Sequence, residues 1–187
     1  MSSRVAKLVS AYRQHLTVPW QADLAAIQRV IFAIYDKADE LRLRANVEEF
    51  ALATQHAGKQ WLLLDITHAF PEWMAAQEYR DAYFEFPEDL AGYPTGELIE
   101  FIADLNATLK ARIRAEAGPD TVVALLGVGT LFGLARVSSV VEGIKEAIQG
   151  RLLVFFPGEY HPENHSYRLL DARDGWNYLA VPLLAQD

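Results

Sequence analysis

Three glycines give this sequence its most specific chemical pattern: Gly127, Gly129 and Gly133, in the stretch VALLGVGTLFGLARVSS. A buried strand, a glycine-rich turn and the start of a helix follow one another there, which is the arrangement of a phosphate-binding loop. The third glycine, however, comes one residue later than in a dinucleotide-binding loop, and no Lys-Ser/Thr pair follows as in a P-loop. Two interpretations stay open: a nucleotide site, or glycines that let the chain leave a buried strand sharply.

Other polar side chains follow predicted strands and could act as acids, bases or metal ligands. Asp65 and His68 could form an acid–base pair or half of a metal site if they converge. His161 and His165 are spaced i, i+4, but a proline and an asparagine lie between them, which predicts a loop rather than a ligand-bearing helix face. The chain has no cysteine and no G-x-S-x-G nucleophile motif. We therefore expect no catalytic site, no metal and no cofactor.

Strands and helices alternate along the sequence, and the strands end next to these residues. Apolar runs bounded by polar residues predict buried strands, as in a parallel sheet covered on both faces. The predicted strands are RVIFAIYD (29–36), QWLLLDI (60–66), TVVALL (121–126) and RLLVFF (151–156). Helical spacing of apolar residues predicts helices over 2–16, 37–58, 68–82 and 97–116, and another from Ser138 or Ser139.

The order of these elements predicts an α/β fold in one domain, residues 1–187. We expect a three-layer sandwich with a mostly parallel central sheet and helices on both faces. A parallel sheet would bring Asp36, Asp65, His68, the glycine turn and Glu159 to the edge where ligands bind. The C-terminal stretch YRLLDARDGWNYLAVPLL predicts a β-hairpin with Asp174-Gly175 as its turn.

Single residues are predicted to begin or end several elements. Thr95 is expected to cap the helix at 97–116, and Ser139 and Glu142 have the spacing of a capping box. Pro157 cannot donate to a strand ladder, so the strand before it is expected to stop there.

The composition excludes or disfavours several classes of protein. The 187 residues carry a net charge of −8, contain no cysteine and include no apolar run long enough to span a membrane. The N-terminal stretch lacks the apolar core of a signal peptide, so we expect a soluble, cytoplasmic protein. The acidic balance disfavours direct binding of nucleic acid, although Lys110, Arg112 and Arg114 form a small basic group.

Residues 68–95 combine aromatic rings with acids. Aromatic side chains dominate the energetic centres of protein interfaces, and a surrounding acidic rim would attract a basic partner. The alternative is a flap whose rings cover the sheet. The candidate partner-binding residues are Trp73, Tyr79, Tyr83, Phe84, Glu85 and Phe86.

The C-terminal stretches GRLLVFFPGEY and YRLLDARDGWNYLAVPL, with the earlier IYDKADELRLR and LLLDI, resemble the BrxB family of the BREX (bacteriophage exclusion) defence systems. The resemblance implies a small cytoplasmic component that works beside an AAA+ ATPase, a PglZ-like protein and an adenine-specific methyltransferase. It brings no catalytic residues. The matched motif positions are Phe155, Phe156, Pro157, Gly158, Arg168, Asp171, Arg173, Asp174, Gly175, Trp176 and Asn177.

The sequence and the resemblance together favour a non-enzymatic adaptor that bridges the larger BREX subunits, the PglZ-like protein and the ATPase above all. The methyltransferase is a further possible partner, and a homodimer stays open. The alternative is an enzyme that binds or hydrolyses a nucleotide at the loop from Gly127 to Gly133.

Overall fold

The computed structural model describes residues 3–21, 23–91, 97–170, 172–177 and 180–185, with the backbone alone for 91 and 172–177. Its strands are β1 (Val30–Tyr35), β2 (Gln60–Asp65), β3 (Thr121–Leu126), β4 (Arg151–His161), β5 (Ser166–Leu169), β6 (Ala172–Asn177) and β7 (Val181–Leu183). Its α-helices are α1 (Arg4–Leu16), α2 (Glu40–Ala45), α3 (Val47–His56), α4 (Ala69–Ala76), α5 (Arg80–Glu85), α6 (Ile99–Glu116) and α7 (Val137–Ile144).

The central sheet has the strand order β2-β3-β4-β1-β7, and every neighbouring pair in it is parallel. Beyond this sheet, β4 pairs with β5 and β5 with β6, both antiparallel. The predicted α/β sandwich with a mostly parallel sheet and a C-terminal hairpin is therefore confirmed. All four predicted strands are present.

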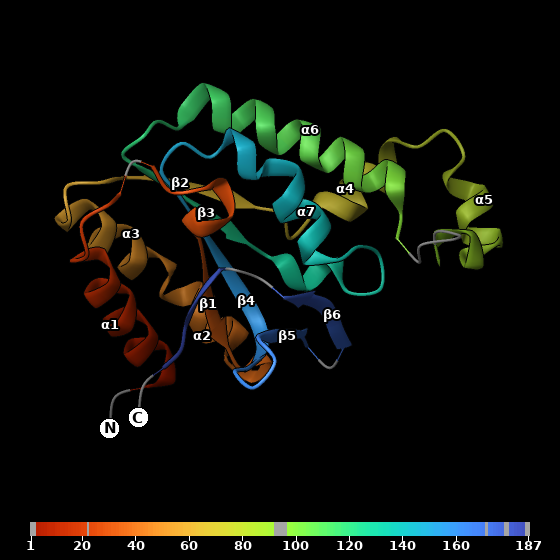
Figure 1. Ribbon diagram of the computed structural model, residues 1–187. Helices are drawn as coiled ribbons and strands as arrows, with labels where there is room; N and C mark the ends of the chain where they lie inside the picture. Colours follow the sequence, from red (N-terminus) through yellow and green to blue (C-terminus); the bar gives the residue numbers. More distant parts are fainter. Residues whose placement is uncertain (1–2, 22, 92–96, 171, 178–179, 186–187) are drawn as a thin grey trace.

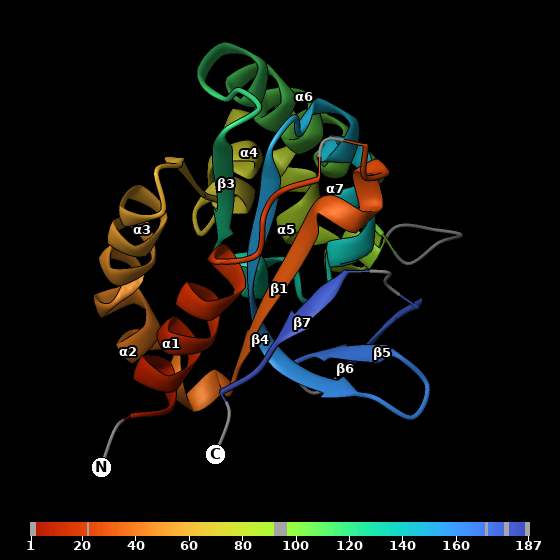
Figure 2. The same ribbon diagram turned by 60° about the vertical axis from the view of Figure 1, so that its left-hand side comes forward.

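Helices cover both faces of the sheet (Figures 1 and 2), and each face has its own apolar core. Side chains alternate along β1, so that Ile31 and Ala33 pack with α1 and α3 while Phe32 and Ile34 pack with the layer of α4, α6 and α7. Because both faces are covered, β1 and β3 are buried along their whole length. This is why their sequences are continuously apolar.

The strand before Pro157 does not stop there, so that prediction was wrong. Pro157 is the last partner of β1, opposite Tyr35, and β4 continues to His161 by pairing with β5 from Gly158 onwards. Pro157 has no backbone N–H to donate, so the ladder between β4 and β1 ends there. From Gly158 onwards β4 pairs with β5 instead. A Cβ at Gly158 would overlap the Arg168 carbonyl, so glycine allows this close approach.

The hairpin turn also lies elsewhere than predicted. Strand β5 ends at Leu169 and β6 begins at Ala172, so the chain reverses between these two strands, and Asp174 and Gly175 lie inside β6. Leu170 adopts φ 54°, the left-handed conformation that reverses the chain there.

The predicted capping box was wrong as well. The Glu97 carboxylate, which lies just before α6, accepts from the Arg136 backbone N–H at 2.9 Å and from the Ser139 hydroxyl at 2.6 Å. An acid distant in sequence thus satisfies the N-terminus of α7, and Ser139 donates to it instead of capping the helix itself. The predicted cap Thr95 lies outside the described residues.

Two predicted helices are each divided in two. The helix at 37–58 is interrupted at Asn46, whose side chain donates to the Arg42 carbonyl at 2.7 Å, between α2 and α3. The helix at 68–82 breaks after Ala76, and α5 then extends to Glu85.

Candidate functional site

The carboxyl ends of the parallel strands meet at one edge of the sheet, as the sequence predicted. Asp36 follows β1, Asp65 ends β2 and Gly127 follows β3 directly. A crevice of about 250 Å³ opens there, lined by Lys37, Glu40, Arg44, Thr67, Gly127, Gly129, Thr130, Pro157 and Leu170. A hollow of about 420 Å³ lies on the same edge and shares Lys37 and Leu170 with the crevice; Asp36, Glu159 and His161 also line it. Ligands of open α/β sheets bind at this edge, so it is the candidate site.

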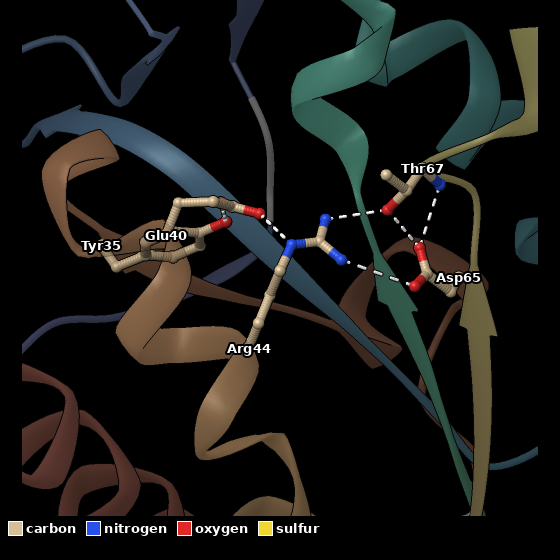
Figure 3. Close-up of polar contacts among 5 residues, drawn as sticks. All are labelled: Tyr35, Glu40, Arg44, Asp65 and Thr67. Carbon is tan, nitrogen blue, oxygen red and sulfur yellow. Dashed lines mark hydrogen bonds and ion pairs between the residues drawn. The ribbon is translucent and has the colours of Figure 1, made fainter. Parts of the chain in front are cut away.

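Arg44 is the centre of the polar contacts at this edge (Figure 3). Its Nε donates to Glu40 Oε1 at 2.6 Å and its Nη2 donates to the Thr67 hydroxyl at 2.8 Å. Its Nη1 lies 3.5 Å from Asp65 Oδ2. One guanidinium therefore joins α2, the end of β2 and the loop after β2, and every nitrogen of its fork has a partner.

Tyr35 and Thr67 complete this network. The Tyr35 hydroxyl donates to Glu40 Oε2, and the Thr67 backbone N–H donates to Asp65 Oδ1 at 2.9 Å. Burial raises the pKa of Tyr35 far above its usual value, and the hydrogen bond to the Glu40 carboxylate raises it further. The phenol therefore stays protonated and acts as a structural donor, not as a base.

The glycine turn packs directly against this network. Gly127 has φ +88°, and a Cβ there would stand 2.5 Å from the Thr67 hydroxyl oxygen and 2.7 Å from the Thr67 amide nitrogen. Gly133 also has a positive φ, +78°, in open space, whereas a Cβ at Gly129 would make only an ordinary contact with Pro157. Gly127 and Gly133 thus have backbone conformations that favour glycine, and Gly127 also allows close packing against Thr67.

The helix after the glycine turn is poorly placed to bind a phosphate. Its first residue is Val137, ten positions beyond Gly127, with a short 3-10 turn between them. The N–H of its N-cap residue Arg136 and the Ser139 hydroxyl already donate to the Glu97 carboxylate. A phosphate there would have to displace an internal anion.

The histidines named in the sequence lie in different surroundings, and His161 Nε2 is 3.6 Å from Glu159 Oε2 in the hollow. Asp65 is held by Thr67 and Arg44, and His68 lies exposed at the N-cap of α4. His165 Nδ1 is 2.9 Å from the Tyr160 hydroxyl, in the turn between β4 and β5 that the sequence predicted as a loop. Within the described ranges, no group of three His, Cys, Asp or Glu residues could hold a metal ion.

The candidate partner-binding residues divide into a buried and an exposed group. Trp73 is buried, and its Nε1 donates to Asp104 Oδ2 at 2.9 Å. Tyr83 is half-buried beside it, with ring centroids 6.4 Å apart. Tyr79, Phe84 and Phe86 are 74%, 73% and 48% exposed, and Glu85 is exposed beside them. The segment is therefore both a cover for the core and an outward-facing surface; Tyr93 lies outside the described residues.

The family-motif residues that are described lie in structural positions. Phe155 packs edge-on against Phe50 in the core beside α1 and α3, and Phe156 stacks on Phe32 in the other core. Pro157 and Gly158 carry β4 from the parallel sheet to the hairpin, where Arg168 opposes Glu159. Arg173, Asp174, Gly175, Trp176 and Asn177 belong to the backbone of β6, and Asp171 lies outside the described residues.

Sequence reasoning missed the residues that organise this edge. Glu40 and Arg44 lie in a predicted helix and in the stretch IYDKADELRLR that carries the family resemblance, but the sequence assigns no site role to them or to Thr67. An available signal was the i, i+4 spacing of Glu40 and Arg44 immediately after a buried strand, because such a pair lies on one face of a helix that starts at the ligand-binding edge.

The fold and its edge define an α/β sandwich protein whose strand-end polar groups are paired with one another. The family model for "BREX protein BrxB" matches residues 62–183 of the 187, which is more than half of the chain. The chain belongs to the BrxB family and is a component of a BREX phage-defence system. Searches of curated proteins and of solved structures found no match. Among the described residues, no helix is both long enough and apolar enough to cross a membrane.

Proposed function

We propose that this protein is a non-enzymatic, cytoplasmic adaptor that bridges larger BREX subunits, the PglZ-like protein and the AAA+ ATPase. The observation that supports the proposal lies at the carboxyl edge, where each nitrogen of the Arg44 guanidinium contacts Glu40, Asp65 or Thr67. A catalytic edge needs polar groups aimed at a substrate, whereas these groups are aimed at one another. Membership of the BrxB family supports partners within the BREX system.

The competing function, nucleotide binding at Gly127 to Gly133, has less support from the geometry. Gly127 and Gly129 line the crevice of about 250 Å³, which is below the range of about 300–1,000 Å³ typical of sites for drug-sized ligands. The neighbouring hollow of about 420 Å³ is not lined by these glycines. The Cβ position of Gly127 faces Thr67 rather than open space. No feature of the described turn requires a phosphate.

The test is to co-express a tagged copy with the PglZ-like and ATPase proteins of the same system, purify it and determine the mass of the complex by light scattering. We expect a complex of defined stoichiometry that contains this chain and both partners. A complex with only one of the two proteins would show that this chain binds a partner but does not bridge two. A lone, well-folded chain would refute it, and a doubled mass without partners would identify a homodimer instead.

A further inference from the structure

Helix α5 and the 3-10 turn that follows it, Pro87–Ala91, lie at the opposite end of the molecule from α1 (Figure 1). They stand beyond the N-terminal end of α6, on the side of the sheet that carries α4 and α7. A partner could approach this end without meeting the carboxyl edge. A bridging protein needs two such separate surfaces, of which this end offers one.

Three large aromatic rings point outward from this end. Tyr79, Phe84 and Phe86 fall within eight consecutive residues and are 74%, 73% and 48% exposed. Scattered exposed apolar residues are ordinary on protein surfaces, but three exposed rings concentrated on one short segment are not. Aromatic side chains bury a large apolar area for few rotatable bonds, which is why they dominate the centres of interfaces.

The inner side of the same segment holds it against the core. Tyr83 packs on Trp73, and Trp73 contacts the ring of Phe101 at 5.7 Å between centroids as well as donating to Asp104 on α6. Leu90 also packs against this core. The outward rings are therefore carried on a fixed support, so docking requires little ordering of the segment.

The charge around the rings determines what kind of partner fits. Residues 78–89 contain five acids, Glu78, Asp81, Glu85, Glu88 and Asp89, against the single base Arg80. All five acids are exposed, and Arg80 lies 3.7 Å from Asp81. Unlike charges across an interface steer the encounter, and like charges repel a wrong partner.

We infer that Tyr79, Phe84 and Phe86, surrounded by these acids, dock into an apolar pocket with a basic rim on another protein of the BREX complex. This inference rests on the proposed adaptor function and assigns one of its two contacts. The chemistry excludes nucleic acid, because the acidic rim repels phosphates. We call these three rings with the five acids the acidic-aromatic surface.

The test titrates the labelled chain with the separately purified PglZ-like and AAA+ proteins in turn. Substituting Tyr79, Phe84 and Phe86 together by alanine should weaken binding to one of them about 30-fold or more, the size expected of an interface centre. Leu41→Ala is the matched control, because Leu41 is 83% exposed on α2, outside this segment, and it should leave affinity unchanged. Circular dichroism melting should show both variants folded.

A second variant separates charge from apolar contact. Asp81→Asn with Glu85→Gln and Glu88→Gln keeps the rings and should slow association and flatten its salt dependence, while dissociation changes less. If the wild-type chain binds but neither variant alters binding, this surface is refuted while the adaptor function stands. If the wild-type chain binds neither protein, the adaptor function itself fails. Loss of a self-associated form in the aromatic variant would mean that a second copy, not a basic partner, occupies the surface.

Discussion

Gly127 shows at the scale of one residue why a phosphate-loop pattern can arise for packing reasons. Replacing it with alanine should lower the free energy of unfolding by about 2 kcal/mol or more, because the left-handed backbone strains any L side chain and the new methyl would collide with Thr67. Urea denaturation gives this difference.

Gly133→Ala is the matched control for that substitution. Gly133 has a similar positive φ, +78°, but its missing Cβ faces open space, so only the backbone strain of about 1–2 kcal/mol should appear. Equal costs at the two glycines would contradict the close packing of the turn on Thr67.

His15 makes a pH-dependent contribution to stability. Burial lowers the pKa of His15 from its usual value of 6.5, and the positive charge of Arg151 lowers it further. The unfolded chain therefore takes up a proton first as the pH falls below about 6.5, and the native state loses stability until the folded pKa is passed.

His15→Gln should remove this loss. Between pH 7.5 and pH 5, denaturant titrations should show a smaller fall in unfolding free energy for the variant than for the wild type. A parallel fall in both proteins would mean that His15 does not titrate differently in the folded state.

At the scale of elements, Arg44 joins α2 to the end of β2. A double-mutant cycle of Arg44→Met with Glu40→Gln should give a coupling energy of about 1 kcal/mol, because the pair is half-shielded and Glu40 also accepts from Tyr35. The exposed pair Arg112–Glu116 has the same i, i+4 spacing and is the control; its coupling should be smaller. A coupling for Arg44 no larger than that of the control would contradict the structural role of the network.

Local sequence patterns were sufficient to predict the elements but not how they meet. Continuous apolar runs such as VIFAIY are produced by burial on both faces, so four strands and the sandwich could be predicted. The Glu97 cap on α7 and the close contact between Gly127 and Thr67 join residues far apart in the chain, and no local spacing encodes them. The predicted strand end at Pro157 is wrong because a strand that changes partners looks locally like a strand that ends.

Residues 68–95 also show that local sequence does not encode tertiary contacts. Composition was enough to choose the segment, but a helix of six residues has too few turns for periodicity to separate inner from outer rings. Only the tertiary contacts place Trp73 and Tyr83 on the core and leave Phe84 in solvent. For the carboxyl edge, parallel topology correctly grouped the strand ends, whereas the side chain that pairs them, Arg44, comes from the following helix.

At the scale of the whole molecule, the two apolar cores share one sheet and should unfold together, as expected for one domain. Ile31 of β1 packs in the core beside α1 and α3, and Ile113 of α6 packs in the other core; both are almost completely buried. Ile31→Val and Ile113→Val should each lower the free energy of unfolding by about 0.5–1.5 kcal/mol through the lost methyl group.

Each of these two variants should keep a single transition in which near-ultraviolet and far-ultraviolet circular dichroism coincide. The physical reason is that β1, β3 and β4 contribute side chains to both cores, so neither helical layer can separate without exposing the opposite face of the same strands. A variant with two transitions, one of them unshifted, would show that the layers are independent units. In that case a partner bound at α5 would stabilise only the layer of α4, α6 and α7.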